Sequence, residues 1–339
     1  MTLPSRLVTL GWDDRFALEF QPYAATGLVP ARVIAEHQHI YRVSTEGDDL
    51  LARVAGRARH RWREREAFPA VGDWVALRLA AHDGTPRIEG VLPRRSRFSR
   101  KAAGRAVEQQ VLAANVDTVF LVSGLDHDFN PRRIERYLIT AWAGGVAPVV
   151  VLNKADACDE VDGRRRAVEA IAPGVPIAVT SARRGDGLEE LRAHVRPGRT
   201  VAFLGSSGVG KSTLINALLG EARQATREVR ASDQRGRHTT THRELIVMPG
   251  GGLLIDTPGM RELQLWEGEG ALAAAFPDIE ALAAECHFTD CTHDREPRCA
   301  VKQAVADGRL PAVRLAQYQT LRGEGAGRAR RQGSGIRDQ

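Results

Sequence analysis

No stretch of this sequence is apolar enough to cross a lipid bilayer. The first residues, MTLPSRLVTLGWDDRF, also lack the apolar segment that secretory signals carry, so we expect a cytoplasmic protein with no membrane partner. No internal repeat is visible. With 339 residues, of which 43% are hydrophobic, the chain is long enough for two or three domains with a substantial core.

Cysteine is scarce, with four residues that are unevenly placed. Cys158 has no partner residue close to it in the sequence, so we expect an ordinary, partly buried thiol. The others form a C-x4-C-x-H-x5-C pattern, and a cytoplasmic cluster of this kind is more often a metal site than a set of disulfides. Three thiolates and one imidazole complete a tetrahedral shell, which predicts one structural zinc; another metal or unliganded thiols are the alternatives. The predicted ligands are Cys286, Cys291, His293 and Cys299.

Charge is slightly unbalanced, since 48 Lys and Arg face 42 Asp and Glu, and the net charge of +6 favours a polyanionic partner. Positive charge is concentrated in two stretches, RARHRWRER and PRRSRFSRKAAGR. In the first, alternate arginines would share one face of an extended chain, opposite Trp62: Arg57, Arg59, Arg61, Arg63 and Arg65. Such a surface neutralises RNA phosphates with little sequence selectivity, but it could equally be a charged, solvated barrel edge.

The pattern of elements changes along the chain. Short strand-like runs between about residues 28 and 98 predict a small barrel of OB type, a fold that commonly binds oligonucleotides. Buried strands then alternate with helices from about Pro131, Gly163, Gly187 and Lys211, which predicts a parallel sheet. We divide the chain into an N-terminal extension (1–27), a barrel (28–105), an α/β domain (106–262), a helical zinc-binding domain (263–322) and a disordered basic tail (323–339).

The segment GSSGVGKST matches the phosphate-loop pattern G-x-x-x-x-G-K-[ST] between an apolar strand and a helix, a context that disfavours a chance glycine-rich turn. Its backbone amides should surround the phosphates. Lys211 should bridge the β- and γ-phosphates, and Ser212 should ligate Mg²⁺. The predicted loop comprises Gly205, Ser206, Ser207, Gly208, Val209, Gly210, Lys211, Ser212 and Thr213.

A second phosphate-reading segment is DTPG, which follows the buried strand GGLLI. Asp256 stands at a Walker-B position, where it would hold Mg²⁺ through water. The amide of Gly259 could meet the γ-phosphate. This motif is weak alone and becomes informative because a phosphate loop precedes it.

Two further strand ends predict recognition of guanine. In NKAD, Asp156 would accept hydrogen bonds from the two donors on the edge of guanine, and adenine would leave this carboxylate unpaired. Lys154 would pack along the base, while Asn153 and Ala155 complete the loop. In TSA, Ser181 and Ala182 follow another strand, and the Ala182 amide could donate to guanine O6.

The order of these motifs is unusual, because ordinary GTPases place the phosphate loop first. Here NKAD and TSA precede GSSGVGKST and DTPG. A nucleotide site depends on which strand ends meet in space. If the original N- and C-termini of a GTPase domain are joined and the chain is opened at another point, the same strand ends still meet, so the site is preserved. The order therefore predicts a circularly permuted α/β P-loop GTPase domain.

The permuted order, the preceding barrel and the Cys₃His cluster together resemble the RsgA (YjeQ) family of small-ribosomal-subunit-dependent GTPases over roughly residues 28–322. The resemblance implies an OB barrel, a permuted GTPase core and a zinc-bearing helical domain. It also implies that the protein hydrolyses GTP to GDP and phosphate and assists late maturation of the small subunit. GRHTTTH looks like the family's first switch, with Thr240 or Thr241 as a Mg²⁺ ligand.

DTPG is followed directly by Met260, in the place where Ras-like GTPases carry the glutamine that orients the attacking water, so we expect slow intrinsic hydrolysis that the subunit stimulates. The resemblance suggests His238 as the catalytic substitute; a packed or solvent-facing histidine is the alternative. We expect GTP and GDP, Mg²⁺, the small subunit and its rRNA as ligands of a monomer. Two alternative functions remain: an rRNA-binding scaffold that uses GTP structurally, and a GTPase that acts on another RNA.

Overall fold

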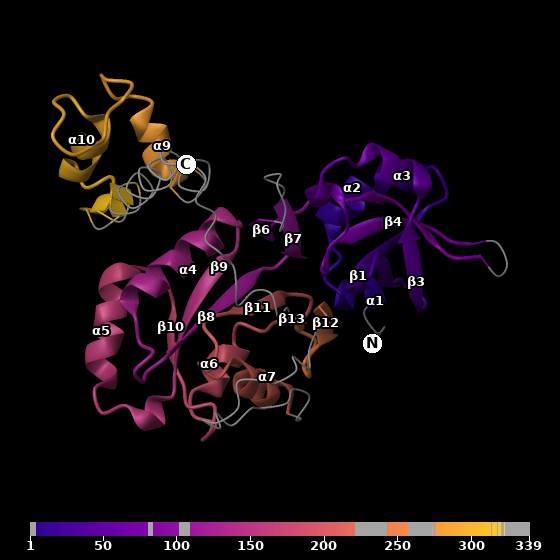
Figure 1. Cartoon of the computed structure of the whole chain (residues 1–339), viewed down its shortest axis with the longest axis horizontal. Helices are drawn as coiled ribbons and strands as arrows, with labels where there is room; N and C mark the ends of the chain where they lie inside the picture. The colour runs from indigo at the N-terminus through magenta and orange to yellow at the C-terminus, as the bar shows by residue number, and fades with distance from the viewer. Residues whose placement is uncertain are drawn as a thin grey trace, which may run out of the picture.

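The computed structural model describes residues 5–80, 84–101, 109–220, 243–256, 273, 276–312, 314–316, 318–319 and 322. Figure 1 shows three parts: a barrel in indigo and purple, an α/β domain, and a small helical unit in orange and yellow. The barrel and the helical unit lie on different sides of the α/β domain, which carries the nucleotide motifs.

Five strands form the barrel, in the order β1-β2-β3-β5-β4, and a β1–β4 pairing closes it. Strands β3 and β5 run parallel and the other neighbours antiparallel. In β4, Val75 and Leu77 point into the barrel, whereas Trp74 and Ala76 join the main core outside it, so successive side chains alternate between two apolar clusters. The strands are β1 (Val29–His37), β2 (Ile40–Ser44), β3 (Asp49–Val54), β4 (Trp74–Arg78) and β5 (Arg87–Val91).

Two N-terminal helices, α1 (Arg6–Thr9) and α2 (Asp14–Ala24), precede the barrel. The side chain of Asp13 caps α2 by accepting a hydrogen bond from the amide of Phe16. The ring of Trp12 lies edge-on to Trp74 of β4, with centroids 4.7 Å apart, so this segment packs on the barrel wall.

The first basic stretch is not extended, so the condition under which its alternate arginines would share one face is not met. Its first half forms helix α3 (Gly56–Arg61), and a 3₁₀ turn, η1 (Arg65–Ala67), follows. Ala58 is fully buried and fixes the helix against the barrel. Because alternate residues of a helix lie on different faces, the arginines predicted to share one face do not do so.

The α/β domain has the predicted parallel sheet, in the order β10-β9-β8-β11-β13, with β12 antiparallel at its edge. A separate hairpin of β6 (Arg97–Lys101) and β7 (Gln109–Ala114) leads into it. The strands are β8 (Thr118–Gly124), β9 (Ala147–Asn153), β10 (Ile177–Val179), β11 (Thr200–Leu204), β12 (Arg243–Val247) and β13 (Leu253–Asp256).

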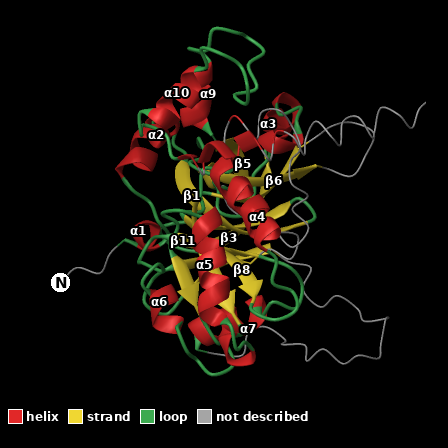
Figure 2. Cartoon of the chain, turned by 90° about the vertical axis from the view of Figure 1, so that its left-hand side faces the viewer, coloured by secondary structure: helices red, strands yellow, loops and turns green. Residues whose placement is uncertain are grey.

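Helices cover both faces of this sheet. Residues of α4 and α5 share one apolar cluster with the strands, and residues of α6 and α7 share a second cluster. Figure 2 shows α4 and α5 in front of the strands. The four helices begin close to the predicted positions: α4 (Pro131–Ala143), α5 (Val161–Ile171), α6 (Leu188–Arg192) and α7 (Lys211–Leu219).

The helical unit contains α9 (Pro277–Ala283) and α10 (Ala300–Ala306). Its apolar cluster takes in Trp142 from the end of α4, which attaches the unit to the α/β domain. The guanidinium of Arg314 lies 4.7 Å from the ring centroid of Phe276 and 5.7 Å from that of Trp142. Among the described residues, no helix has the length and apolar character needed to cross a membrane. The predicted tail, residues 323–339, lies outside the described residues.

The barrel and the α/β domain share one continuous sheet. Strand β1 of the barrel pairs with β12 through Ala35 and Glu36, opposite Glu244 and Arg243. This pairing joins the five barrel strands to the six of the α/β sheet, in a single sheet of 11 strands.

A buried arginine reinforces that junction. The side chain of Arg32, on β1, is only 2% exposed. It donates to the carbonyl oxygens of Leu10 and Gly72, to that of Asn115 at 3.4 Å, and to the Thr200 hydroxyl at 2.8 Å. Burial lowers the pKa of Arg32 to about 10, so the side chain stays charged at neutral pH. One cation thus joins the N-terminal helices, the barrel and strand β11.

We expect Arg32→Met to lower the free energy of unfolding by roughly 2–4 kcal/mol, because it leaves buried oxygen atoms without donors. Urea denaturation followed by tryptophan fluorescence measures the loss. Arg57→Met is the control, since the Arg57 side chain is 70% exposed and solvent screens its pair with Glu89. Equal stability of the two variants would contradict a structural role for Arg32.

Candidate nucleotide and metal sites

The four predicted nucleotide motifs meet at one edge of the parallel sheet. NKAD follows β9, TSA follows β10, the phosphate loop follows β11, and Asp256 ends β13. Strand β8 lies between β9 and β11, so the chain adds strands first on one side of β8 and then on the other, and the strand order reverses there. Open α/β sheets bind their ligands at such a switch point, outside the carboxyl ends of the strands.

The side chain of Asn153 physically links three of the motifs. It is 2% exposed, and its Nδ2 donates to the carbonyl of Val209 in the phosphate loop at 2.8 Å. Its Oδ1 accepts from the Thr180 hydroxyl at 3.1 Å and from the Ala182 amide at 3.0 Å. Gly210 leaves room for this side chain, since an added Cβ would lie 2.2 Å from Asn153 Nδ2. The Asn153 side chain thus holds the phosphate loop and the TSA segment against NKAD.

Asp156 is held in place by the other base-reading loop. Ser181 Oγ donates to Asp156 Oδ1 at 2.7 Å. This hydrogen bond is the main reason that the pKa of Asp156 is lowered, and Arg184 and Arg183 add to the effect. The carboxylate is therefore ionised at neutral pH, as an acceptor for two guanine donors must be.

The Ala182 amide, which the sequence suggested as a donor to guanine O6, already donates to Asn153 Oδ1. A bond to the base would require this amide to be shared or released. That role stays a prediction.

The structure adds a contact to which the sequence did not point. Lys154 has a φ of 67°, in the left-handed region, and its ammonium lies 2.7 Å from Asp126 Oδ2. Asp126 follows β8, at the switch point of the sheet. In the sequence, the only indication of a role for Asp126 is its position just after a buried strand, and Asp126 belongs to none of the recognised motifs.

The phosphate loop has the backbone form that its sequence requires. Gly208 and Gly210 have φ values of 83° and 96°, and α7 begins directly after them at Lys211. The Lys211 ammonium, largely buried, donates to the carbonyl of Gly205 at 2.6 Å and to that of Ser206. The start of a helix and a lysine together form a suitable site for phosphate.

The Mg²⁺ residues are only partly described. Ser212 lies in the first turn of α7 and Asp256 at the end of β13, both half-buried. Hydroxyl and carboxylate oxygens suit Mg²⁺. The other predicted residues, His238, Thr240, Thr241 and Gly259, lie outside the described residues, as does Met260.

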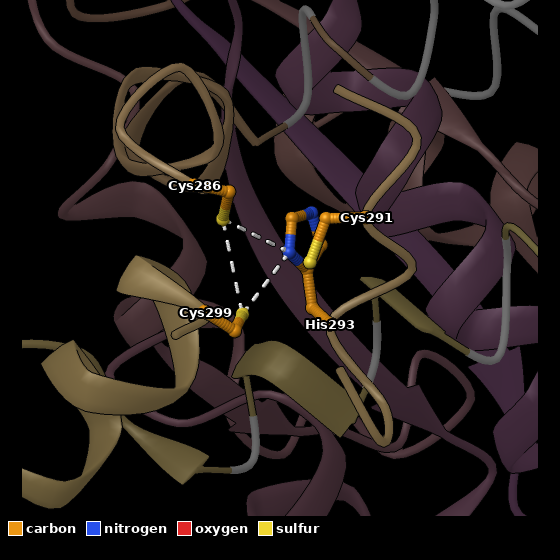
Figure 3. A group of neighbouring side chains, drawn as sticks. All are labelled: Cys286, Cys291, His293 and Cys299. Carbon is orange, nitrogen blue, oxygen red and sulfur yellow. Dashed lines mark hydrogen bonds between the residues drawn. The ribbon is translucent and has the colours of Figure 1, made fainter. Parts of the chain in front are cut away.

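The Cys₃His cluster is assembled in the helical unit, where its four ligand atoms lie within 4.8 Å of one another (Figure 3). Cys286 Sγ and Cys299 Sγ are 3.8 Å apart, and His293 Nδ1 lies 3.6 and 3.4 Å from them. A tetrahedral zinc shell has S–S edges of about 3.8 Å and S–N edges of about 3.5 Å, given its bond lengths. The cluster could therefore hold zinc. Cys158 instead packs, half-buried, against the main core, as the sequence suggested.

Neighbouring groups orient these ligands. The Cys299 sulfur accepts a hydrogen bond from the Lys302 amide at 3.4 Å, at the start of α10. Gln319 donates to the His293 carbonyl at 2.6 Å, and Arg322 donates to the Cys291 carbonyl at 2.9 Å. Burial, aided by Arg322, lowers the pKa of His293, which favours the neutral imidazole that a metal requires.

Comparison with known proteins decides the family. The RsgA GTPase family model matches residues 91–266. The chain belongs to the RsgA GTPase family. It is 53% identical over 334 residues to the small ribosomal subunit biogenesis GTPase RsgA of Opitutus terrae, covering 96% of this chain and 91% of that protein. It is 47% identical over 323 residues to that of Syntrophotalea carbinolica, covering 93% and 88%.

Two solved RsgA-like structures are similar as well. The crystal structure of YjeQ from Thermotoga maritima has a TM-score of 0.65 and 30% identity, covering 88% of this chain and 99% of that one. YloQ, described as a circularly permuted GTPase, has a TM-score of 0.61 and 26% identity, covering 89% and 96%. The predictions of a GTPase enzyme and of an OB-type barrel before a permuted core are confirmed.

We expect Cys291→Ser to reduce bound zinc well below the one equivalent predicted for the purified protein, because three ligands bind zinc less tightly than four. The helical unit should melt earlier, while GDP binding should persist because the nucleotide motifs are untouched. Metal analysis and calorimetry measure these effects. Cys158→Ser is the control and should keep its zinc; protein that holds no metal when purified without chelator would contradict the assignment.

Proposed function

We propose that this chain hydrolyses GTP to GDP and phosphate and couples the reaction to late maturation of the small ribosomal subunit. It would act in the cytoplasm, where ribosomes mature, as a monomer with no membrane partner. The hydrogen bonds of Asn153 carry the nucleotide part of the proposal, since they hold the base-reading loops against the phosphate loop. The relatives' names, which specify small ribosomal subunit biogenesis, support the second part.

In this proposal, the amides of residues 205–213 and the Lys211 ammonium bind the phosphates. Ser212, Asp256 and either Thr240 or Thr241 would hold Mg²⁺, which would supply positive charge to the phosphate oxygens, and the Gly259 amide would lie near the γ-phosphate. Asp156 binds the guanine edge. One structural zinc would be held by the Cys₃His cluster, whose four ligands leave no position open for a reacting molecule.

Hydrolysis by the protein alone should be slow. Met260, and not glutamine, directly follows DTPG, so we expect a rate on the order of 10⁻⁴ to 10⁻² s⁻¹, as in unaided Ras-like switches. His238 stays the predicted residue for positioning water, on the strength of the family resemblance. Binding to the small subunit would then raise the rate by ordering the switch.

A groove on the barrel is the best candidate for rRNA contact. It has a volume of about 810 Å³ and runs between the barrel and β7. Arg53, Arg59 and Arg87 line it; all three are exposed, and none has an ion pair with a described acidic residue. Exposed guanidinium groups without carboxylate partners suit RNA phosphates.

The second basic stretch contributes less to that surface than its sequence suggested. Arg94 donates to both carboxylate oxygens of buried Asp73, at 2.8 and 2.7 Å. Arg95 pairs with Asp13 and lies over the ring of Phe16. These two cations hold the fold together, so the groove arginines are the better candidates for RNA.

We expect Asp156→Asn to lose GTP and gain xanthosine triphosphate, because the base of xanthosine presents an acceptor where guanine presents a donor. Discrimination at such a site can reach about 10⁴-fold. Competition binding with the two nucleotides measures the exchange. Ser181→Ala, which keeps the carboxylate, should retain the preference for guanine. Unchanged GTP affinity in Asp156→Asn would remove NKAD from the site.

We expect the triple variant Arg53→Gln, Arg59→Gln and Arg87→Gln to keep its basal GTPase rate but to lose stimulation by purified small subunits. The slope of log affinity against log salt should fall by about 2, since three phosphate contacts are removed. Steady-state phosphate release with and without subunits is the measurement.

The matched control for this experiment is Arg15→Gln, Arg57→Gln and Arg78→Gln, which removes three exposed charges outside the groove. Equal stimulation of the two triple variants would place the contact elsewhere. No stimulation of the unmodified protein would favour a scaffold that uses GTP structurally.

A further inference from the structure

The loop of residues 125–130 lies between the two halves of the proposed nucleotide site. It connects β8 to α4, and β8 stands between the strands that precede NKAD and the phosphate loop. The loop is attached to NKAD by its backbone, since the Leu125 amide donates to the Asn153 carbonyl at 2.7 Å. Asn130 then caps α4 by accepting from the Arg133 amide.

Asp126 is held firmly within this loop. Its Oδ1 accepts from the Asp128 amide at 3.1 Å, and its carbonyl accepts from the Phe129 amide and from Arg164 of α5 at 3.0 Å. Burial opposes ionisation, but the hydrogen bonds from Lys154 and the Asp128 amide lower the pKa of Asp126 below its usual value. The carboxylate is therefore a fixed negative charge at neutral pH.

Gly124 provides the space for this carboxylate. A Cβ added there would lie 2.6 Å from Asp126 Oδ1. The side chain of Asp126 is 18% exposed and that of Lys154 is 31% exposed, so solvent weakens their attraction only in part.

Lys154 needs such a partner to hold a defined orientation. Its left-handed backbone, which is costly for a residue with a Cβ, fixes where the side chain starts. Its four-carbon stem would otherwise be free to rotate. The ion pair with Asp126, 2.7 Å long, fixes the other end.

We propose that Asp126 is a positioning residue for the nucleotide, which holds the Lys154 ammonium so that the lysine stem lies flat along one face of the guanine. The inference rests on the proposed guanine site. It predicts that Asp126 acts on nucleotide affinity, through Lys154, and not on the hydrolytic step.

The test compares Asp126→Ala with the unmodified protein. We expect the Kd for GDP and the KM for GTP to rise about tenfold, while kcat at saturating GTP changes less than twofold. Asp126→Asn keeps an acceptor oxygen for Lys154 and should recover about half of the lost affinity on a logarithmic scale. An unchanged Kd, or a fall in kcat alone, would overturn the proposal.

The matched control is Asp128→Asn, which removes a charge from the same loop. Asp128 pairs with Arg133 and not with Lys154, so GDP affinity should stay within twofold. A loss equal to that of Asp126→Ala would show that only the fold or net charge of the loop matters, and would overturn the inference.

A double-mutant cycle tests the route through Lys154. Lys154→Met keeps the stem but removes the charge, so adding Asp126→Ala to it should cost little more affinity for GDP. If the loss of GDP affinity in the double variant equals the product of the losses in the two single variants, Asp126 does not act through Lys154, and the proposal is contradicted.

One more pair of variants separates this inference from the guanine assignment. In the Asp156→Asn background, Asp126→Ala should weaken binding of xanthosine diphosphate by the same factor as it weakens GDP, because the stem contacts the face of the base. If Asp156→Asn fails to exchange the nucleotides, the guanine site is wrong. If the exchange occurs and Asp126→Ala has no effect, only the inference fails.

Discussion

The hydrogen bonds of one carboxamide, on Asn153, are the interaction on which the site depends. Its two polar atoms bind two other loops, the phosphate loop and TSA, and its burial makes an unpaired atom costly. These hydrogen bonds require only that the strand ends lie together in space, and they do not depend on the order of the strands along the chain. A permuted GTPase domain can therefore keep the geometry of the site, provided that the same strand ends meet.

Much of this fold could be predicted because its signals are local. A phosphate loop needs glycines at fixed places, and Gly208 and Gly210 do have positive φ values. The helix beginning at Pro131 followed from the alternation of buried strands with helices along the sequence. The Cys₃His cluster could be predicted from spacing because its four side chains lie within 14 residues.

The remaining features depend on contacts between distant segments. The arginines of the first basic stretch would share one face only in an extended chain, but residues 56–61 form helix α3 with Ala58 buried. Arg94 looked like an RNA contact because sequence cannot show that Asp73 binds it. The pair of Asp126 with Lys154 joins loops that follow different strands, and no motif records such a contact.

The pairing of β1 with β12 has a practical consequence for anyone who wishes to study the GTPase domain in isolation. Cutting the barrel away would uncover the backbone of Arg243 and Glu244 along an outer strand that already carries exposed Val247. Bare, apolar strand edges of this kind recruit other chains and promote aggregation. Recombinant fragments should therefore retain the barrel, or carry a charged residue in place of Val247, if they are to stay dispersed.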